Sequence, residues 1–195
     1  MKGISLITKI AVCFCGILLI ISAFVCPDAF AQQAKPVPIP TIQPPAWYQT
    51  LPSDQRFAMV MDGQAVLDRE TGLVWEKSPS MDTTNWLGAQ SYCIYLTTGG
   101  RLGWRLPAIQ ELASLVDLSV SAPALPSGHP FTNVQADNLT DNYWSATTIA
   151  LVTTYAWGVN FYLGIVADFN GPGDLSKDGH NYVWCVRGGQ GLDPQ

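Results

Sequence analysis

The sequence predicts an α+β fold, and three observations along the chain support this class. Short apolar runs separated by tight turns open the globular part, two stretches with helical spacing come next, and strands joined by long loops close it. Helices followed by a set of antiparallel strands are typical of α+β domains. With 195 residues, 48% of them hydrophobic, the chain is long enough to bury one core.

Residues 1–31 have the composition of a signal peptide. Two lysines precede an apolar stretch over residues 10–25, and Ala29-Phe30-Ala31 places small residues before a cleavage position. We therefore expect an exported protein, periplasmic or extracellular, whose N-terminal segment engages the membrane only during export. Two alternatives remain open: lipidation at Cys26, and anchoring in the inner membrane by an uncleaved signal.

Residues 32–55 are rich in proline and predict an extended linker without regular structure. The globular domain is expected over residues 56–190. Removal of residues 1–31 changes the formal net charge from −5 to −6, because that segment carries two Lys and one Asp. An acidic chain without a run of Lys or Arg argues against nucleic acid as a partner.

The first three strands are expected at residues 57–60, 65–68 and 73–75. The pairs Asp62-Gly63 and Thr71-Gly72 separate them and are typical of tight turns. The later strands are expected after the helices. They span residues 143–147, 155–161, 165–167 and 182–187.

The first helix is expected over residues 86–96, with Asn85 as its N-cap. Apolar side chains share one face of this helix. They are Trp86, Ala89, Cys93 and Leu96. The second helix is expected over residues 107–117, with Pro107 in its first turn, where the missing N–H is no loss.

Several motifs stand in order between residues 56 and 187. They are Arg56-Phe57, Asp62-Gly63, Val66-Leu67-Asp68, 71–77, Asn85-Trp86, Ala89-Gln90, Tyr92-Cys93, 103–112, Tyr143-Trp144-Ser145, 156–161 and Cys185-Val186-Arg187. Together they resemble the Lcl C-terminal domain family of bacterial exported proteins, which is similar to C-type-lectin-like folds. The resemblance implies a lectin-like α+β domain with two helices and short antiparallel sheets.

The resemblance also implies a binding module in an adhesion-type role, with a glycan or an envelope or surface protein as partner. A structural or assembly protein of the envelope is the first alternative. An enzyme related to the formylglycine-generating group is the second, but those enzymes use a reactive Cys pair. We expect no enzyme, since His129 and His180 lie in Gly/Pro-rich loops without a nucleophile elbow.

Cys93 and Cys185 are the cysteines left once residues 1–31 are removed. In an oxidising compartment an isolated pair usually forms a disulfide, while two buried thiols or a zinc site remain alternatives. In the lectin-like folds that the family resembles, a Cys of the first helix is bonded to one of the last strand. The resemblance therefore implies a Cys93–Cys185 bridge.

The family usually has Thr where this chain has Ala108, which would complete a capping box with Glu111. Loss of the side-chain acceptor costs about 1 kcal/mol. We therefore expect Ala108→Thr to raise the melting temperature. Arg105 is expected to reach buried carbonyls or a carboxylate such as Glu111.

Carboxylate and amide side chains gather in one Gly-rich loop over residues 168–181. They are Asp168, Asn170, Asp174, Asp178 and Asn181. A second group consists of Asp141 and Asn142, and Asp137-Asn138 lies just before it. We expect a ligand to contact these two loops, and an ordinary solvated loop is the alternative.

No cofactor or metal is expected. Calcium is the alternative, at Asp168, Asn170 and Asp174, because it takes roughly six to eight oxygen ligands from flexible positions. The spacing does not match an EF-hand. Six tryptophans are candidates for a sugar-stacking platform, but alternation along the later strands favours core positions for most of them. They are Trp75, Trp86, Trp104, Trp144, Trp157 and Trp184.

Overall fold

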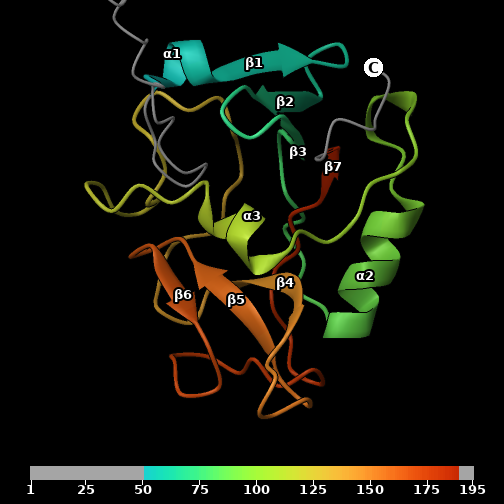
Figure 1. Ribbon diagram of the computed structural model, residues 1–195, viewed down its shortest axis with the longest axis vertical. Coiled ribbons are helices and arrows are strands. Elements are labelled where there is room, and N and C mark those ends of the chain that lie inside the picture. The colour runs from blue at the N-terminus through green and yellow to red at the C-terminus, as the bar shows by residue number, and fades with distance from the viewer. Residues whose placement is uncertain (1–50, 189–195) are drawn as a thin grey trace, which may run out of the picture. The chain divides into compact units, whose positions relative to one another are not determined.

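Two antiparallel sheets and three α-helices form residues 51–188, the part of the chain that the computed structural model describes (Figure 1). The elements are α1 (Ser53–Arg56), β1 (Phe57–Val60), β2 (Ala65–Asp68), β3 (Leu73–Glu76), α2 (Trp86–Tyr95), the 3₁₀ turn η1 (Thr98–Gly100), α3 (Ile109–Ala113), β4 (Asn142–Thr148), β5 (Ala156–Asn160), β6 (Ile165–Ala167) and β7 (Val186–Gly188). The expected α+β class is confirmed.

The predicted signal peptide, residues 1–31, and residues 32–50 of the predicted linker lie outside the described residues. The last residues of that linker belong to α1. No helix between residues 51 and 188 has the length and apolar character needed to cross a membrane.

The first sheet has the strand order β1-β2-β3-β7. Ala58 pairs with Leu67 across β1 and β2, and the turn between these strands places Asp62 and Gly63 at positive φ, where glycine is favoured. The antiparallel pairing of β7 with β3 brings the last described strand next to the third. The three predicted strands at the start of the domain are therefore confirmed.

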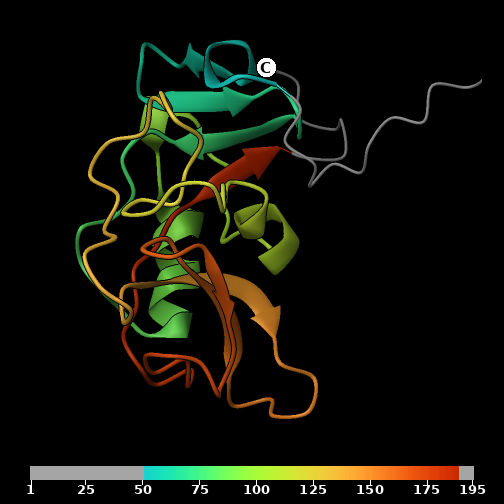
Figure 2. The ribbon, with the colours of Figure 1, turned by 90° about the vertical axis from the view of Figure 1, so that its left-hand side faces the viewer.

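The second sheet has the order β4-β5-β6 and lies at the opposite end of the domain from the first (Figures 1 and 2). Val159 of β5 pairs with Tyr143 of β4 and with Val166 of β6. A register shift between Trp144 and Thr148 interrupts the pairing of β4 with β5.

The prediction of one strand over residues 182–187 is wrong. The backbone of Tyr182 pairs with β4: its N–H donates to Asn142 O at 2.9 Å, and its carbonyl accepts from Trp144 N at 3.0 Å. The chain then leaves this sheet, and β7 begins only at Val186. Two different pairing partners divide the expected strand into two parts.

The predicted second helix is wrong at both ends, because α3 spans only Ile109–Ala113. Pro107 precedes the N-cap, and its carbonyl accepts a hydrogen bond from Ala146 N at 2.7 Å. The carbonyl is thus engaged by β4 rather than by a helical turn. At the other end, Asp117 N donates to Ala124 O at 3.0 Å, outside any helix.

Helix α2 begins where the sequence predicts. The Asn85 side chain accepts a hydrogen bond from Gly88 N at 2.8 Å and caps the first turn. Cys93 of α2 forms a disulfide with Cys185, and the two Cα atoms are 5.5 Å apart. Both cysteines are fully buried. The predicted bridge is confirmed, and it ties α2 to the segment that leads into β7.

Side chains alternate along the strands and divide the core into two clusters. On β3, Trp75 faces one cluster and Val74 faces the other. The first cluster includes Leu112 of α3, and we call it the α3-side cluster. The second includes Cys93 of α2, and we call it the α2-side cluster. Each helix therefore covers its own half of the core.

Aromatic rings fill the centre of the α3-side cluster. Four rings lie 4.9–5.9 Å from the Trp184 ring, centroid to centroid, at angles typical of edge-to-face or tilted packing. They belong to Trp75, Phe131, Tyr143 and Phe161. Four tryptophans are at most 2% exposed, which confirms that most of them serve the core. They are Trp75, Trp104, Trp144 and Trp184.

Candidate functional site

The predicted ligand loop, residues 168–181, lies at the end of the domain occupied by the second sheet (Figure 1). Its carboxylates close local turns. Asp168 accepts a hydrogen bond from Asn170 N at 2.8 Å, and Asp174 accepts one from Ser176 N at 2.8 Å. The hydrogen bonds from Ser176 hold the pKa of Asp174 below its usual value. Both carboxylates therefore have partners within the loop.

Two of the predicted amide ligands are buried and connect the loops. Asn142 Nδ2 donates to Pro172 O at 2.8 Å, and Asn181 Nδ2 donates to Asp174 O at 2.7 Å. Both asparagines are at most 2% exposed. Gly173 lies at positive φ directly against the Asn142 amide. The structure thus brings the loop that contains Asp174 next to the start of β4.

The remaining predicted residues lie at the surface. Asp178 and Asn170 are exposed, and Asp141 is partly exposed. Asp141 Oδ2 accepts hydrogen bonds from the N–H groups of Asp137 and Asn138 at 2.9 and 3.1 Å. This carboxylate also closes a local turn. Although Asp141 is partly exposed, two hydrogen bonds already occupy Oδ2, which leaves fewer lone pairs for a ligand.

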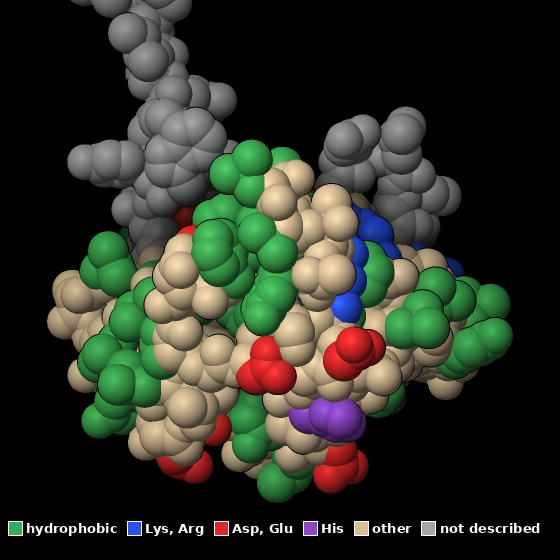
Figure 3. All heavy atoms as spheres, turned by 90° about the horizontal axis from the view of Figure 1, so that it is seen from below, with side chains coloured by type: hydrophobic (Ala, Val, Ile, Leu, Met, Phe, Trp, Pro, Cys, Tyr) green, Lys and Arg blue, Asp and Glu red, His purple; other side chains and the backbone are tan. Residues whose placement is uncertain are grey.

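The described part of the chain contains no group of three or more His, Cys, Asp or Glu side chains placed to hold a metal ion. Seen from the end that carries these loops, carboxylates, a histidine and Lys or Arg side chains lie scattered among uncharged surface (Figure 3). The three residues considered for calcium, Asp168, Asn170 and Asp174, belong to the loop over residues 168–181. The carboxylates of Asp168 and Asp174 accept hydrogen bonds from the protein backbone.

The outer face of α2 is a different kind of surface, because the whole helix carries no charged residue. Four of its large apolar side chains are exposed. Their exposed fractions are Leu87 67%, Tyr92 38%, Ile94 60% and Tyr95 81%. We call these four residues the α2 face. Isolated apolar side chains are common at protein surfaces, whereas several on one helix mark interaction sites.

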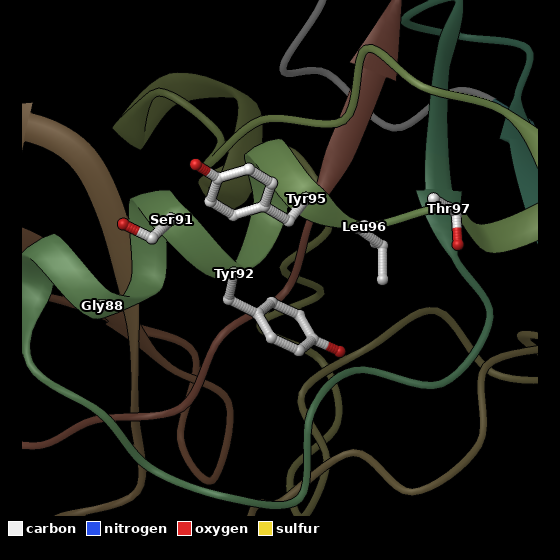
Figure 4. Close-up of a pocket in the computed structure, with 6 residues that line it drawn as sticks. All are labelled: Gly88, Ser91, Tyr92, Tyr95, Leu96 and Thr97. Atoms are coloured by element: carbon white, nitrogen blue, oxygen red, sulfur yellow. The ribbon is translucent and has the colours of Figure 1, made fainter.

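A hollow of about 370 Å³ lies along α2 and the turn that follows it. It is lined by Gly88, Ser91, Tyr92, Tyr95, Leu96 and Thr97. In Figure 4 the rings of Tyr92 and Tyr95 project from α2 with their hydroxyl groups pointing in opposite directions. The lining combines two aromatic rings with hydroxyl groups and contains no charge, which suits a ligand with apolar and hydroxylated parts.

A buried carboxyl group lies next to the disulfide, on the last residue of β3. Glu76 Oε2 accepts a hydrogen bond from Cys185 N at 2.9 Å. Burial raises the pKa of Glu76 to about 7, and the hydrogen bond from Cys185 offsets only part of this rise. Burial, together with the charges of Glu76 and Asp82, also raises the pKa of Tyr92. The Tyr92 hydroxyl is therefore protonated at neutral pH.

Helix α3 is held by an ion pair between Arg105 and Glu111. Both Arg105 nitrogens Nη1 and Nη2 donate to the Glu111 carboxylate at 2.7 Å, and Nη2 also donates to Gly188 O at 3.0 Å. This confirms the predicted contact of Arg105 with Glu111. Burial alone would raise the pKa of Glu111, but hydrogen bonds from Arg105 and Ala108 N lower it overall. Arg105 and Glu111 therefore position α3.

Sequence reasoning missed the α2 face. It placed four apolar residues on the buried side of the first helix and did not consider the opposite side. The signal was present, because residues 86–96 contain no Asp, Glu, Lys or Arg at all. A surface helix normally presents charged or polar residues to water. A helix without them predicts a second covered face.

A comparison with protein families identifies the family of the domain. No curated protein matches the chain. The family model named Lcl C-terminal domain matches residues 64–187, which is more than half of the chain and runs from the β1–β2 turn into β7. The chain therefore belongs to the Lcl C-terminal domain family.

Proposed function

We propose that this protein is an exported binding module of C-type-lectin-like fold, which recognises a carbohydrate or a protein at the cell envelope or surface in an adhesion-type role. The observation that carries the proposal is the α2 face. Leu87, Ile94 and Tyr95 are more than half exposed on a helix whose opposite side is already packed into the α2-side cluster. These exposed side chains therefore do not contribute to the packing of the core.

The disulfide supports both the fold and the compartment in this proposal. It joins the first long helix to the segment before the last strand, which is the bridge expected of a lectin-like domain. Disulfides persist in oxidising compartments. Together with the signal-like residues 1–31, the bridge favours a periplasmic or extracellular location.

The chemistry of the α2 face favours a protein partner at this surface. Leu87 and Ile94 are aliphatic, and Tyr95 adds a large ring with a polar edge. Exposed aliphatic and aromatic side chains without charges are typical of the centre of a protein interface. The proposed role is non-enzymatic, and both cysteines of the described domain are engaged in the disulfide.

Site-specific photo-crosslinking tests this proposal in cells that produce the full chain. A benzophenone amino acid replaces Tyr95 in one variant and Leu151 in a control variant, since Leu151 is 94% exposed but lies in the turn between β4 and β5. We expect a discrete crosslinked product at position 95, lost when Ile94→Ser is added, and none at position 151.

A glycan array probed with the full chain, with and without calcium, covers the carbohydrate branch of the same proposal. Crosslinking that is equal at both positions would exclude the α2 face as the partner site. The absence of both a position-specific crosslink and glycan binding would overturn the binding-module proposal as a whole.

A further inference from the structure

A second hollow, of about 390 Å³, lies between α3 and the second sheet. It is lined by Ile109, Gln110, Ala113, Thr147, Trp157 and Val166, and we call it the α3 groove. Its volume is within the roughly 300–1,000 Å³ of small-molecule sites. Its lining comes from α3 and from all three strands of the second sheet, so regular elements hold it in place.

Trp157 differs from the other tryptophans between residues 51 and 188. Four of them are buried in the core, and Trp86 donates its indole N–H to Ser145 O while Lys177 covers its ring at 4.1 Å. Trp157 is only partly buried. Within the described residues its ring has no aromatic or cationic neighbour, and its indole N–H has no hydrogen-bond partner. One part of this indole is therefore available to a ligand.

Two polar side chains stand beside this indole. Gln110 is exposed, and its amide has no partner among residues 51–188. Thr147 Oγ1 accepts a hydrogen bond from Ile109 N at 3.0 Å, which leaves the hydroxyl proton free to be donated. None of the lining residues is charged. The α3 groove thus offers an apolar ring with donors and an acceptor around it.

We propose that the α3 groove binds a neutral saccharide, with one sugar ring stacked on the Trp157 indole. The C–H face of a pyranose covers the aromatic surface, and its hydroxyl groups bond to Gln110 and Thr147. Saccharides combine an apolar face with a hydroxylated edge, and the groove provides partners for both.

The lining argues against two other occupants. A sulfated or uronic-acid glycan needs Lys or Arg, and the groove has neither while the whole chain is acidic. An aliphatic side chain of a protein would bury the Gln110 amide and the Trp157 N–H without partners, which is unfavourable. The inference rests on the carbohydrate branch of the proposed function and names its ligand class, at a groove that shares no residue with the α2 face.

An array of neutral and anionic oligosaccharides probed with the full chain, followed by titration of the best-bound neutral saccharide, tests the proposal. Gln110→Ala is the primary variant, because Gln110 is exposed and its loss leaves the core intact. Trp157→Leu keeps an apolar side chain but removes the ring. We expect binding to weaken at least about threefold in the first and at least about tenfold in the second. Met81→Ser, at an exposed position between β3 and α2, is the control and leaves binding unchanged.

Melting curves of both variants establish that they are folded before binding is compared. Binding of anionic glycans alone, or no binding of any neutral saccharide, would overturn the proposal. So would neutral-saccharide binding that is insensitive to Gln110→Ala and to Trp157→Leu. The position-95 crosslink is unaffected by any of these results, so failure here is distinct from failure of the proposed function.

Discussion

Helices α2 and α3 each cover one half of the core, but they are fixed to the domain by different means. The buried Cys93–Cys185 disulfide anchors α2, and the helix carries no charged residue. Helix α3 is anchored by Glu111, whose carboxylate accepts hydrogen bonds from Arg105 and from the backbone of Ala108. Helix α2 is thus held by a covalent bond, and α3 is held by an ion pair and a hydrogen bond.

This difference accounts for the surfaces that the two helices present. Within α3, the Glu111 carboxylate is engaged in positioning the helix, and the Gln110 side chain remains free beside the groove. The disulfide fixes α2 from inside, so its outer residues are not required for anchoring. Leu87, Ile94 and Tyr95 can then be exposed for a partner without loss of the helix.

The largest effect is expected from removal of the covalent anchor. The double variant Cys93→Ala/Cys185→Ala opens a bridge between residues 92 positions apart, which by the chain-entropy relation lowers the free energy of unfolding by roughly 4.6 kcal/mol. Denaturant unfolding measures this loss. Arg105→Lys, the matched disruption on α3, is expected to cost about 1 kcal/mol, since the ion pair is partly exposed. Equal losses in the two variants would contradict the comparison.

The next largest expected effect is a change of the free energy of unfolding with pH. It has opposite signs for Glu76, beside α2, and for Glu111 of α3. Glu76 beside α2 has its pKa raised from 4.5 to about 7 by burial. The unfolded chain therefore releases this proton at lower pH than the folded one. The stability contributed by neutral Glu76 is complete below pH 4.5 and is lost as the pH rises through 7. At 1.36 kcal/mol per pH unit, this loss is about 3 kcal/mol.

Glu76→Gln removes this dependence, because the neutral amide can still accept from Cys185 N. The free energy of unfolding of the wild type, relative to this variant, should fall between pH 4.5 and pH 8. Glu111→Gln is the control of opposite sign. The pKa of Glu111 is lowered, so the wild type should gain stability relative to that variant as the pH rises through the carboxyl range. If the free energy of unfolding of the wild type varied with pH in parallel with that of Glu76→Gln, the pKa of Glu76 would not be raised in the folded protein.

Local signals in the sequence predicted the elements whose hydrogen bonds are local. The strands β1–β3 follow from short apolar runs and glycine turns, and Asn85 marks the start of α2. Elements with distant partners were not predictable in this way. Pro107 is compatible with a first helical turn, yet Ala146 of β4 engages its carbonyl. Tyr182 reads as part of the last strand, yet its backbone pairs with β4.

The candidate site shows the same division. The sequence shows which side chains have oxygens, and it led to Asp168, Asp174 and Asp141. It does not show which oxygens are already used, and all three carboxylates accept hydrogen bonds from nearby backbone N–H groups. The α2 face was open to prediction from composition alone, because a charge-free helix is visible in the sequence. The α3 groove was not, since its lining comes from four separate elements.

The smallest expected change in stability concerns the N-caps of α2 and α3. Asn85 caps α2 through its side chain, whereas the N-cap of α3 is Ala108, with extended backbone at ψ 158° and no side-chain acceptor. Half of a capping box already exists there, because Ala108 N donates to Glu111 Oε2 at 2.8 Å. Ala108→Thr adds an acceptor for Glu111 N and should stabilise the domain by about 1 kcal/mol, which raises the melting temperature by about 4 °C.

Ala108→Val is the matched control for this substitution, since valine has the shape of threonine without the hydroxyl group. The melting temperature should rise with Thr and not with Val. An equal rise in both would assign the gain to packing at a partly buried position rather than to the cap. No rise with Thr would count against a helix start at Ile109, where a Thr hydroxyl at position 108 is placed to accept from Glu111 N.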